Sequence, residues 1–379
     1  TKTTGGTLDL SGATFTGFPQ LTVTGGTLVV DPTVGVTTLT TTSPGTLSLS
    51  GTGTLAAALT GTGAVNIISG TTTISSPKTY TGTVTLTSGD LVFDTTGDLG
   101  SGSTVAINGG RTLTLNPTPS ESYAFDVSGT GAITKTGTNI ATIAGTTSGY
   151  GGDISVSAGQ LTLSTVPGAA TTATLSGSGR LNLGGTPTTL ASISTASAAA
   201  VLDIASVDLT VAETGTNTFA GIIQGSGGTF EKSGGGTLTL SGANTYSGAT
   251  TVTAGTLIAS GGSALSDTSA LTVGGSGTLT IAVANETVGS LAGVTGATVN
   301  LGGFTLSTGS DNTSTTYSGT LNGNGTLERT GTGTLTLTTA TITGTTILTN
   351  NGALGTVEVP ADTNFDTINF TAGTVAFTA

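Results

Sequence analysis

The sequence predicts an all-β protein that winds as a β-solenoid with about 20 residues per turn. Three observations lead to this fold class. About a quarter of the 379 residues are Thr, whose branched Cβ suits strands and disfavours helix. Short segments alternate apolar and hydroxyl side chains, and these segments recur at nearly constant spacing. Because no Pro-rich linker or charge run interrupts the pattern, we expect one continuous solenoid over residues 1–379.

The strands are predicted from a period-2 pattern that runs through the chain. Each segment places its Leu residues on one face and its Thr or Ser residues on the other, so one face is buried. Clear examples are Thr7–Leu10, Thr46–Leu49, Thr112–Leu115, Thr237–Leu240 and Thr334–Leu337. Gly residues bound these segments and indicate the corners between strands.

The spacing of the strands distinguishes a solenoid from a sandwich. One series of inward positions is Leu238, Leu257, Leu279, Val299 and Leu321, with steps of 19, 22, 20 and 22 residues. Such a period lets every turn stack its strand on the strand of the preceding turn.

A longer repeat of four related units is superimposed on the turns, with starts near residues 59, 127, 223 and 321. The first glycines of the units, which we expect to form corners, are Gly61, Gly129, Gly225 and Gly323. A large apolar residue follows 19 to 21 residues later, at Tyr80, Tyr150, Tyr246 and Ile342. Since Ile replaces Tyr in the fourth unit, we interpret these residues as core packing and not as a platform for sugar rings.

Composition excludes several kinds of chemistry. The chain has no Cys and no His, which removes thiol nucleophiles, disulfides, and sites that need imidazole or thiolate ligands. The repeated Gly-Gly-x-Gly-x-Asp pattern of calcium-binding solenoids is absent. We therefore predict no catalytic residue, no metal site and no cofactor. A net charge of −12 opposes the binding of a nucleic-acid backbone, so nucleic acid is not an expected partner.

The expected location is extracellular or at a bacterial cell surface. The chain begins at Thr1 without an initiating Met, from which we expect that a signal segment has been removed. No apolar run approaches the roughly 20 residues that span a bilayer, so we expect no membrane insertion by this chain.

The segment Ser233–Leu257 reads SGGGTLTLSGANTYSGATTVTAGTL. It resembles the autotransporter-associated β-strand repeat of passenger regions in large bacterial surface proteins. Weaker matches to that repeat lie at Thr134–Leu163 and Thr330–Leu354, with a degenerate one at Asn66–Leu91. The resemblance implies a right-handed parallel β-helix that is secreted or displayed on a bacterial surface.

Several charged residues are candidates for functional sites. The nearest carboxylate pairs are Asp94 with Asp98, Asp203 with Asp208, and Asp362 with Asp366, which we interpret as loop acids that bind their own backbone. A second set is expected to form a ladder of charges on the surface, at one edge of the coil. Its members are Lys135, Glu231-Lys232 and Glu328-Arg329.

The two ends suggest an interaction surface. Strand-like residues Leu8 and Leu10 come directly at the start, and the last 15 residues contain a dense apolar group. The predicted self-assembly interface therefore consists of Leu8, Leu10, Phe365, Phe370, Val375 and Phe377. Head-to-tail association through such edges would give a homopolymer.

The favoured function is a non-enzymatic extracellular structural protein that associates head-to-tail into a surface fibre or matrix filament. One alternative is a monomeric adhesin of the passenger type that binds surface glycans or a host protein. The other is a polysaccharide lyase or hydrolase of the β-helix type, which would need carboxylates on adjacent turns.

Overall fold

The computed structural model describes residues 1–15, 18–185, 187–338, 341–344, 346–352, 355–360, 365, 367–370 and 372–378. Of residues 369, 370 and 378 it describes the backbone alone. The chain divides into two compact units, Thr1–Thr186 and Pro187–Ala379. Within the described ranges the regular structure is strand throughout, and none of it is helix.

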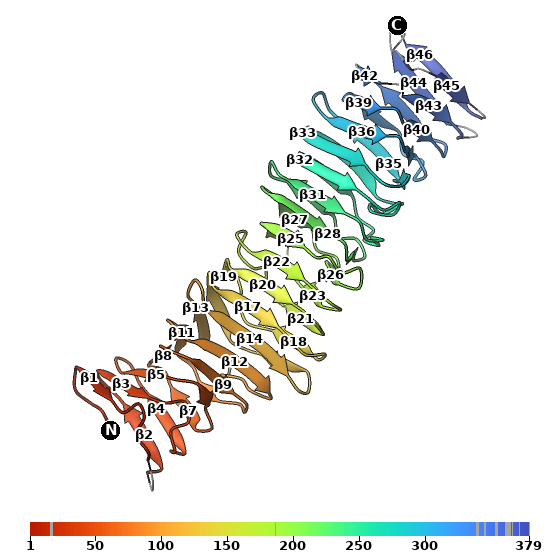
Figure 1. The fold of residues 1–379 in the computed structure, drawn as a ribbon. Helices are drawn as coiled ribbons and strands as arrows, with labels where there is room; N and C mark the ends of the chain where they lie inside the picture. Colours follow the sequence, from red (N-terminus) through yellow and green to blue (C-terminus); the bar gives the residue numbers. More distant parts are fainter. Residues whose placement is uncertain are drawn as a thin grey trace. The chain divides into compact units, whose positions relative to one another are not determined.

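The first unit consists of parallel ladders, in which each strand pairs with the strand about one turn further along the chain (Figure 1). One ladder runs through β1 (Thr7–Asp9), β3 (Thr27–Val30), β5 (Thr46–Leu49), β8 (Ala64–Ile67), β11 (Thr83–Leu86), β13 (Thr104–Ile107), β16 (Asp126–Gly129) and β19 (Gly149–Tyr150). A second runs through β6 (Gly53–Thr54), β9 (Thr71–Ile74), β12 (Asp90–Thr95), β14 (Thr112–Pro117), β17 (Ala132–Lys135), β20 (Asp153–Val156) and β22 (Thr172–Leu175).

Two shorter ladders complete the turns of the first unit. One contains β2 (Gln20–Val23), β4 (Thr38–Thr41), β7 (Ala58–Gly61) and β10 (Thr79–Tyr80). The other contains β15 (Glu121–Tyr123), β18 (Ile140–Ile143), β21 (Gln160–Leu163) and β23 (Arg180–Leu183).

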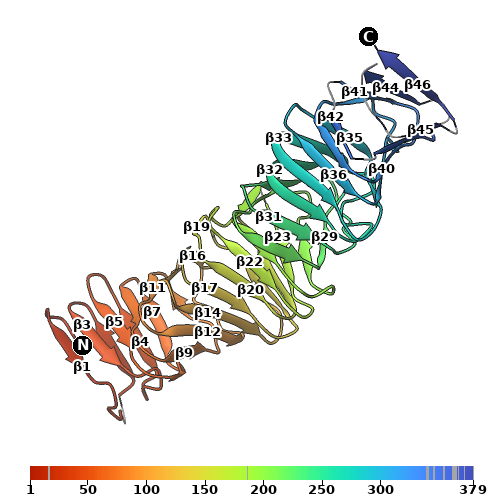
Figure 2. The same ribbon diagram turned by 45° about the horizontal axis from the view of Figure 1, so that its top comes forward.

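The second unit is built in the same way (Figure 2). Its longest ladder runs through β24 (Thr188–Leu190), β27 (Leu209–Ala212), β30 (Phe230–Ser233), β32 (Thr250–Ala259), β33 (Ala270–Ile281), β35 (Ser290–Gly293), β38 (Thr315–Tyr317), β41 (Thr334–Leu337), β44 (Thr356–Pro360) and β46 (Thr374–Thr378). The long strands β32 and β33 also belong to a ladder with β28 (Thr216–Phe219), β31 (Thr237–Leu240), β36 (Thr298–Gly302), β39 (Thr320–Gly323) and β42 (Thr341–Thr343).

The remaining strands of the second unit belong to other sheets. They are β25 (Ser192–Ser194), β26 (Val201–Asp203), β29 (Ile222–Gln224), β34 (Glu286–Thr287), β37 (Thr305–Thr308), β40 (Thr326–Arg329), β43 (Ile347–Asn350) and β45 (Thr367–Phe370). Both units are thus parallel β-solenoids with roughly 20 residues per turn, which confirms the predicted fold class.

The predicted column of inward residues is confirmed by strand register. Leu238 pairs with Leu257, Leu257 with Leu279, Leu279 with Val299, and Val299 with Leu321. All five side chains are 0% exposed. Burial of a stacked aliphatic column stabilises every turn, at about 25 cal/mol per Å² of apolar surface removed from water.

The four unit glycines lie at positive φ, as their predicted role at corners requires. The φ angles are 100° at Gly61, 99° at Gly129, 157° at Gly225 and 102° at Gly323. At Gly61 a Cβ would also lie 1.9 Å from the carbonyl oxygen of Thr41 in the turn before, so a side chain is excluded twice over. The predicted continuity of one coil over residues 1–379, with its four long units, stays a prediction.

Candidate functional site

The predicted interface residues near the start of the chain lie on or next to an edge strand of the first unit. β1 is the first strand of its sheet and pairs with β3, with Leu8 opposite Leu28. Leu8 is 43% exposed and Leu10 is half-buried. The backbone of an edge strand can pair with an added strand, and an exposed apolar side chain on the edge strand can pack against it.

The predicted residues near the other end lie on edge strands of the second unit. β46 is the last strand of its ladder and pairs with β44, with Val375 opposite Val357 and Phe377 opposite Val359. Phe377 is 62% exposed, and Val375 and Phe365 are half-buried. The backbone of Phe370 lies in β45, an edge strand of the neighbouring sheet, while its side chain is outside the described part.

The carboxylates of the predicted acid pairs bind nearby loops. Asp98 accepts a hydrogen bond from the backbone N–H of Leu99 at 2.8 Å, and burial raises its pKa. Asp203 accepts from the N–H of Ala205 at 2.9 Å, and Asp208 accepts from the N–H of Thr229 at 3.2 Å. These contacts confirm the interpretation for Asp98 and Asp203, which bind backbone within two residues of themselves. Asp208 differs, because it binds the backbone of the turn that follows it. Asp362 and Asp366 fall outside the described residues.

Within the described ranges no group of three or more Asp or Glu residues could hold a metal ion. In the same ranges no helix is long and apolar enough to cross a membrane.

The expectation that Lys135, Lys232 and Arg329 lie in a surface ladder of charges is wrong. Lys135 and Lys232 are 0% exposed and Arg329 is 1% exposed, so all three lie inside the coil. The acids next to them do face outward, and Glu231 and Glu328 are half-buried on the outer face. Neighbouring residues of a strand point to opposite faces, which explains why each pair divides between the interior and the surface.

Each buried cation donates to backbone carbonyl oxygens at a glycine-containing corner. The Nζ of Lys232 donates to the carbonyls of Ser233 at 2.6 Å, Gly234 at 2.9 Å and Ala254 at 3.2 Å. The Nζ of Lys135 makes the same set of bonds one long unit earlier, to the carbonyls of Thr136, Gly137 and Ala158. These cations thus join a corner to the turn that follows it.

Arg329 also donates hydrogen bonds to the backbone carbonyls of the corner that follows it. Its guanidinium donates to the carbonyls of Thr330, Gly331 and Gly333.

Burial lowers the pKa of Lys135 to about 8. Burial also lowers the pKa of Lys232 and of Arg329, opposed by the charges of Glu213 and Asp311 respectively.

The tyrosines are buried, which confirms the prediction that they pack in the core. Tyr80, Tyr150, Tyr246 and Tyr317 are 0–1% exposed. The hydroxyl of Tyr150 donates to the carbonyl of Asp153 at 2.6 Å and accepts from the N–H of Ile133 at 3.1 Å. Burial raises the pKa of all four phenols, that of Tyr246 to about 12.

The register of the fourth unit differs from the expected one. Tyr80 and Tyr150 pair with the glycines one turn earlier, Gly61 and Gly129. Ile342, which has the equivalent spacing in the sequence, instead pairs with Leu321. The equivalent Gly–Tyr pair is Gly293 with Tyr317.

The outer faces carry hydroxyl and amide groups that bond from turn to turn. The hydroxyls of Thr210 and Thr253 both donate to the carboxylate of Glu231, at 3.2 and 2.9 Å. In the second unit, Asn322 donates to Asn300 at 3.0 Å and Asn300 donates to Thr280 at 3.2 Å. Apart from the Glu231 carboxylate, these bonds join uncharged groups, which hydrate the surface without a concentration of charge.

Two buried polar residues were missed by the sequence analysis. Asn244 is 5% exposed and Glu286 is 1% exposed. Both bind the backbone of the loop between β32 and β33. The quoted repeat contains Asn244 in its Gly-Ala-Asn-Thr-Tyr string, which could have drawn attention to it. Glu286 had no comparable signal.

The comparison with protein-family models agrees with the resemblance. Residues 230–259 match the family model described as the passenger-associated-transport-repeat, which overlaps the segment Ser233–Leu257. A solved structure, the TibC-catalysed hyper-glycosylated TibA fragment 55–350, is similar at 14% identity with a TM-score of 0.19. That match covers 100% of this chain and 97% of the other. The search of curated proteins gives no match. The chain thus carries a repeat of the passenger type.

Proposed function

We propose that this chain is a non-enzymatic structural module of a bacterial surface protein, and that copies of it associate head to tail through their sheet edges. One observation carries the proposal. The chain forms parallel ladders whose inner faces are apolar and whose outer faces bear hydroxyl groups, and it contains a passenger-type repeat. A repeat of this type supports an extracellular or surface location.

The use of the charged groups supports a structural role. Lys232 and Lys135 bond to backbone carbonyls, and Asp203 and Asp208 hold loops. Acid–base catalysis needs groups that are free to exchange protons with a substrate, whereas these side chains are engaged in holding the coil.

The edge strands support association of the 379-residue chain with itself. A parallel ladder leaves the N–H and C=O groups of its outer strand available for another strand. β1 and β46 are such strands, and Leu8 and Phe377 add exposed apolar surface to them. Pairing of β46 of one copy with β1 of another would extend a ladder without closing it, which gives a filament.

Sedimentation velocity and electron microscopy of the purified chain over a range of concentrations test this association. We expect larger species and filaments as the concentration rises. Phe377→Lys places a charge on the edge and should keep the chain monomeric. Val294→Lys is the matched control, because Val294 is also exposed, at 55%, but lies between strands. A monomer at every concentration, or equal assembly of Phe377→Lys and wild type, would overturn the proposal.

A monomeric adhesin is the second candidate function, favoured by the polar pocket described below.

A polysaccharide lyase or hydrolase is the third candidate function. If the chain lowered the viscosity of a polysaccharide solution, and Asp94→Asn or Asp203→Asn abolished that effect, the enzymatic function would replace the structural one.

A further inference from the structure

The loop between β32 and β33 is held in place by buried polar side chains from the turns before and after it. Asn244 donates from its Nδ2 to the carbonyl of Ala264 at 2.6 Å and accepts at its Oδ1 from the N–H of Ile223 at 2.7 Å. The carboxylate of Glu286 accepts from the N–H groups of Ala264 and Leu265, at 3.2 and 3.1 Å. Ala264 and Leu265 are themselves 0% exposed.

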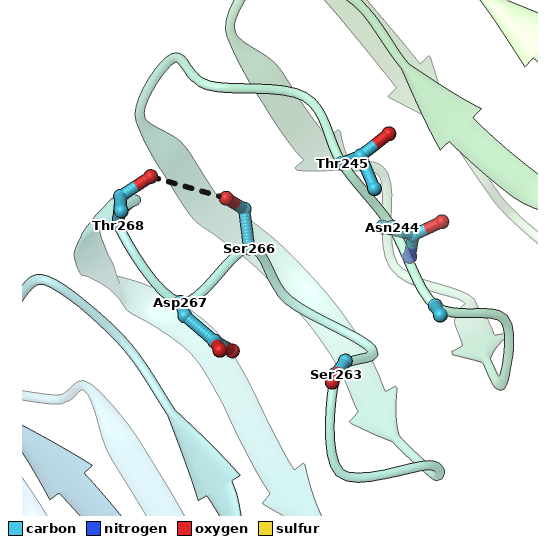
Figure 3. A pocket seen from close by; sticks show the side chains of 7 residues that line it. Asn244, Thr245, Ser263, Ser266, Asp267 and Thr268 are labelled. Atoms are coloured by element: carbon cyan, nitrogen blue, oxygen red, sulfur yellow. Dashed lines mark hydrogen bonds between the residues drawn. The ribbon is translucent and has the colours of Figure 1, made fainter.

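This fixed loop forms one wall of a pocket with a volume of about 380 Å³ (Figure 3). Ser263, Ser266, Asp267 and Thr268 come from the loop, and Ala243, Asn244 and Thr245 come from the turn before it. Ser266 and Asn244 are buried, while Asp267 and Thr268 are exposed at the rim. The hydroxyls of Ser266 and Thr268 lie 3.4 Å apart.

The lining of the pocket defines the chemistry of a ligand. Four hydroxyl groups can each donate and accept a hydrogen bond, and the Asp267 carboxylate can accept from two neighbouring hydroxyls of a ligand. The lining residues include no Lys or Arg, and the chain has a net charge of −12, so an anionic ligand would be repelled. The volume is near the lower end of the range for ligand pockets, which suits a single ring.

The rigidity of the loop reduces the cost of binding. Since Asn244 and Glu286 fix the loop backbone from both sides, its hydroxyls need little ordering when a ligand arrives. The amide of Asn244 is occupied by backbone partners. The groups left to face a ligand are therefore the Asp267 carboxylate and the hydroxyls of Thr245, Ser263, Ser266 and Thr268.

We propose that this pocket binds one ring of a neutral sugar, with Asp267 accepting hydrogen bonds from two adjacent sugar hydroxyls. The site lies partly within the passenger-type repeat, which contributes residues 243–245, and it goes beyond the structural role proposed above. Sugar binding here would let the module attach to glycans along its flank, whether or not copies of it assemble into filaments.

Saturation-transfer NMR with a panel of neutral methyl glycosides tests the proposal. The probes are the methyl pyranosides of glucose, galactose and mannose, with methyl glucuronide as the anionic comparison. We expect at least one neutral glycoside to bind with a millimolar dissociation constant, and the glucuronide to bind more weakly. Asp267→Asn should weaken binding about tenfold, since a charge-assisted acceptor is lost.

Asp208→Asn is the matched control, because Asp208 is also a loop acid of the second unit but does not line the pocket. Its variant should bind like wild type. Absence of binding by all three neutral glycosides would overturn the proposal, as would equal binding by Asp267→Asn and wild type. The NMR measurement is repeated with the Phe377→Lys chain, which is expected to stay monomeric. Sugar binding by that variant would show that the pocket works whether or not the chain assembles into filaments.

Discussion

Glu231 and Lys232 are neighbours on β30 but belong to opposite sides of the coil. On the outer face, the carboxylate of Glu231 accepts hydrogen bonds from the hydroxyls of Thr210 and Thr253. The ammonium of Lys232 lies inside, where it donates to the carbonyls of Ser233, Gly234 and Ala254. The same alternation that buries aliphatic side chains therefore places one charge in the core and one at the surface.

Lys232→Met should destabilise the second unit. Methionine keeps the length and apolar stem of the side chain but leaves three carbonyl oxygens without their donor, which we expect to cost about 2 kcal/mol. Urea unfolding followed by circular dichroism measures the loss. Glu231→Gln is the control, because its amide oxygen can accept from one of the two threonine hydroxyls and its NH2 group can donate to the other. Its midpoint should change little. Equal midpoints for the two variants would contradict a supporting role for the buried ammonium.

The positions of Lys232, Lys135 and Arg329 could have been predicted from alternation alone. Phe230 and Lys232 are two residues apart on one strand, so both point inward with the aromatic ring. The expectation of a surface ladder instead followed the general rule that charged side chains are exposed. That rule does not hold where carbonyls at a corner can take up a cation.

The strands and the inward column were predictable because they depend on local pattern and period. Leu238 and Leu257 are identified by alternation and spacing, and their pairing follows. The loop that Asn244 and Glu286 hold has no period, and its partners lie 20 to 22 residues away in the sequence. Spacing also misassigned Ile342, because turns of unequal length shift the register by two residues.

The stability of the first unit should rise with pH above about 8 because of Lys135. Its pKa is about 8 in the folded chain, against an ordinary value of 10.5, so between these values the unfolded chain binds a proton that the folded chain does not. Stability therefore increases as pH rises through this window. Urea midpoints between pH 7 and about 9.5, below the ordinary ionisation of tyrosine, measure the slope. In Lys135→Met the slope should decrease, and an unchanged slope would count against the assignment.

Glu286 should produce the opposite trend at lower pH. Burial raises its pKa to about 7 from an ordinary 4.5, so in this window the folded chain holds a proton that the unfolded chain has released. Its contribution to stability is present below pH 4.5 and is lost as pH rises to 7. Unfolding midpoints of Glu286→Gln should fall less over the same range, because glutamine does not titrate. The same fall in both proteins would show that another group is responsible.

Tyr123 and Tyr150 should respond differently to removal of the hydroxyl. The hydroxyl of Tyr123 is buried without a hydrogen-bond partner, and the Tyr123 ring packs against the rings of Phe93 and Phe125. That of Tyr150 bonds to Ile133, Gly131 and Asp153. We expect Tyr123→Phe to raise the free energy of unfolding by about 1 kcal/mol and Tyr150→Phe to lower it by about 1–3 kcal/mol. Thermal unfolding of the two variants checks the signs, and destabilisation by Tyr123→Phe would contradict the prediction.

Gly293 should be intolerant of even a methyl group because Tyr317 lies against it. The two residues pair in register, and a Cβ at Gly293 would lie 2.6 Å from two carbons of the tyrosine ring. Tyr317 is 0% exposed, and its hydroxyl donates to the carbonyl of Thr320 at 2.8 Å, so the ring has little room to move. Gly293→Ala should therefore cost about 1–3 kcal/mol through overpacking.

The control for this substitution is Gly235→Ala, where a Cβ would have no heavy atom within 4 Å and φ is not positive. Its unfolding midpoint should stay close to that of wild type. Combining Gly293→Ala with Tyr317→Leu replaces the flat ring by a smaller side chain, so the double variant should lose less than the sum of the single losses. Additive losses would show that the tyrosine ring is not what excludes a side chain at Gly293.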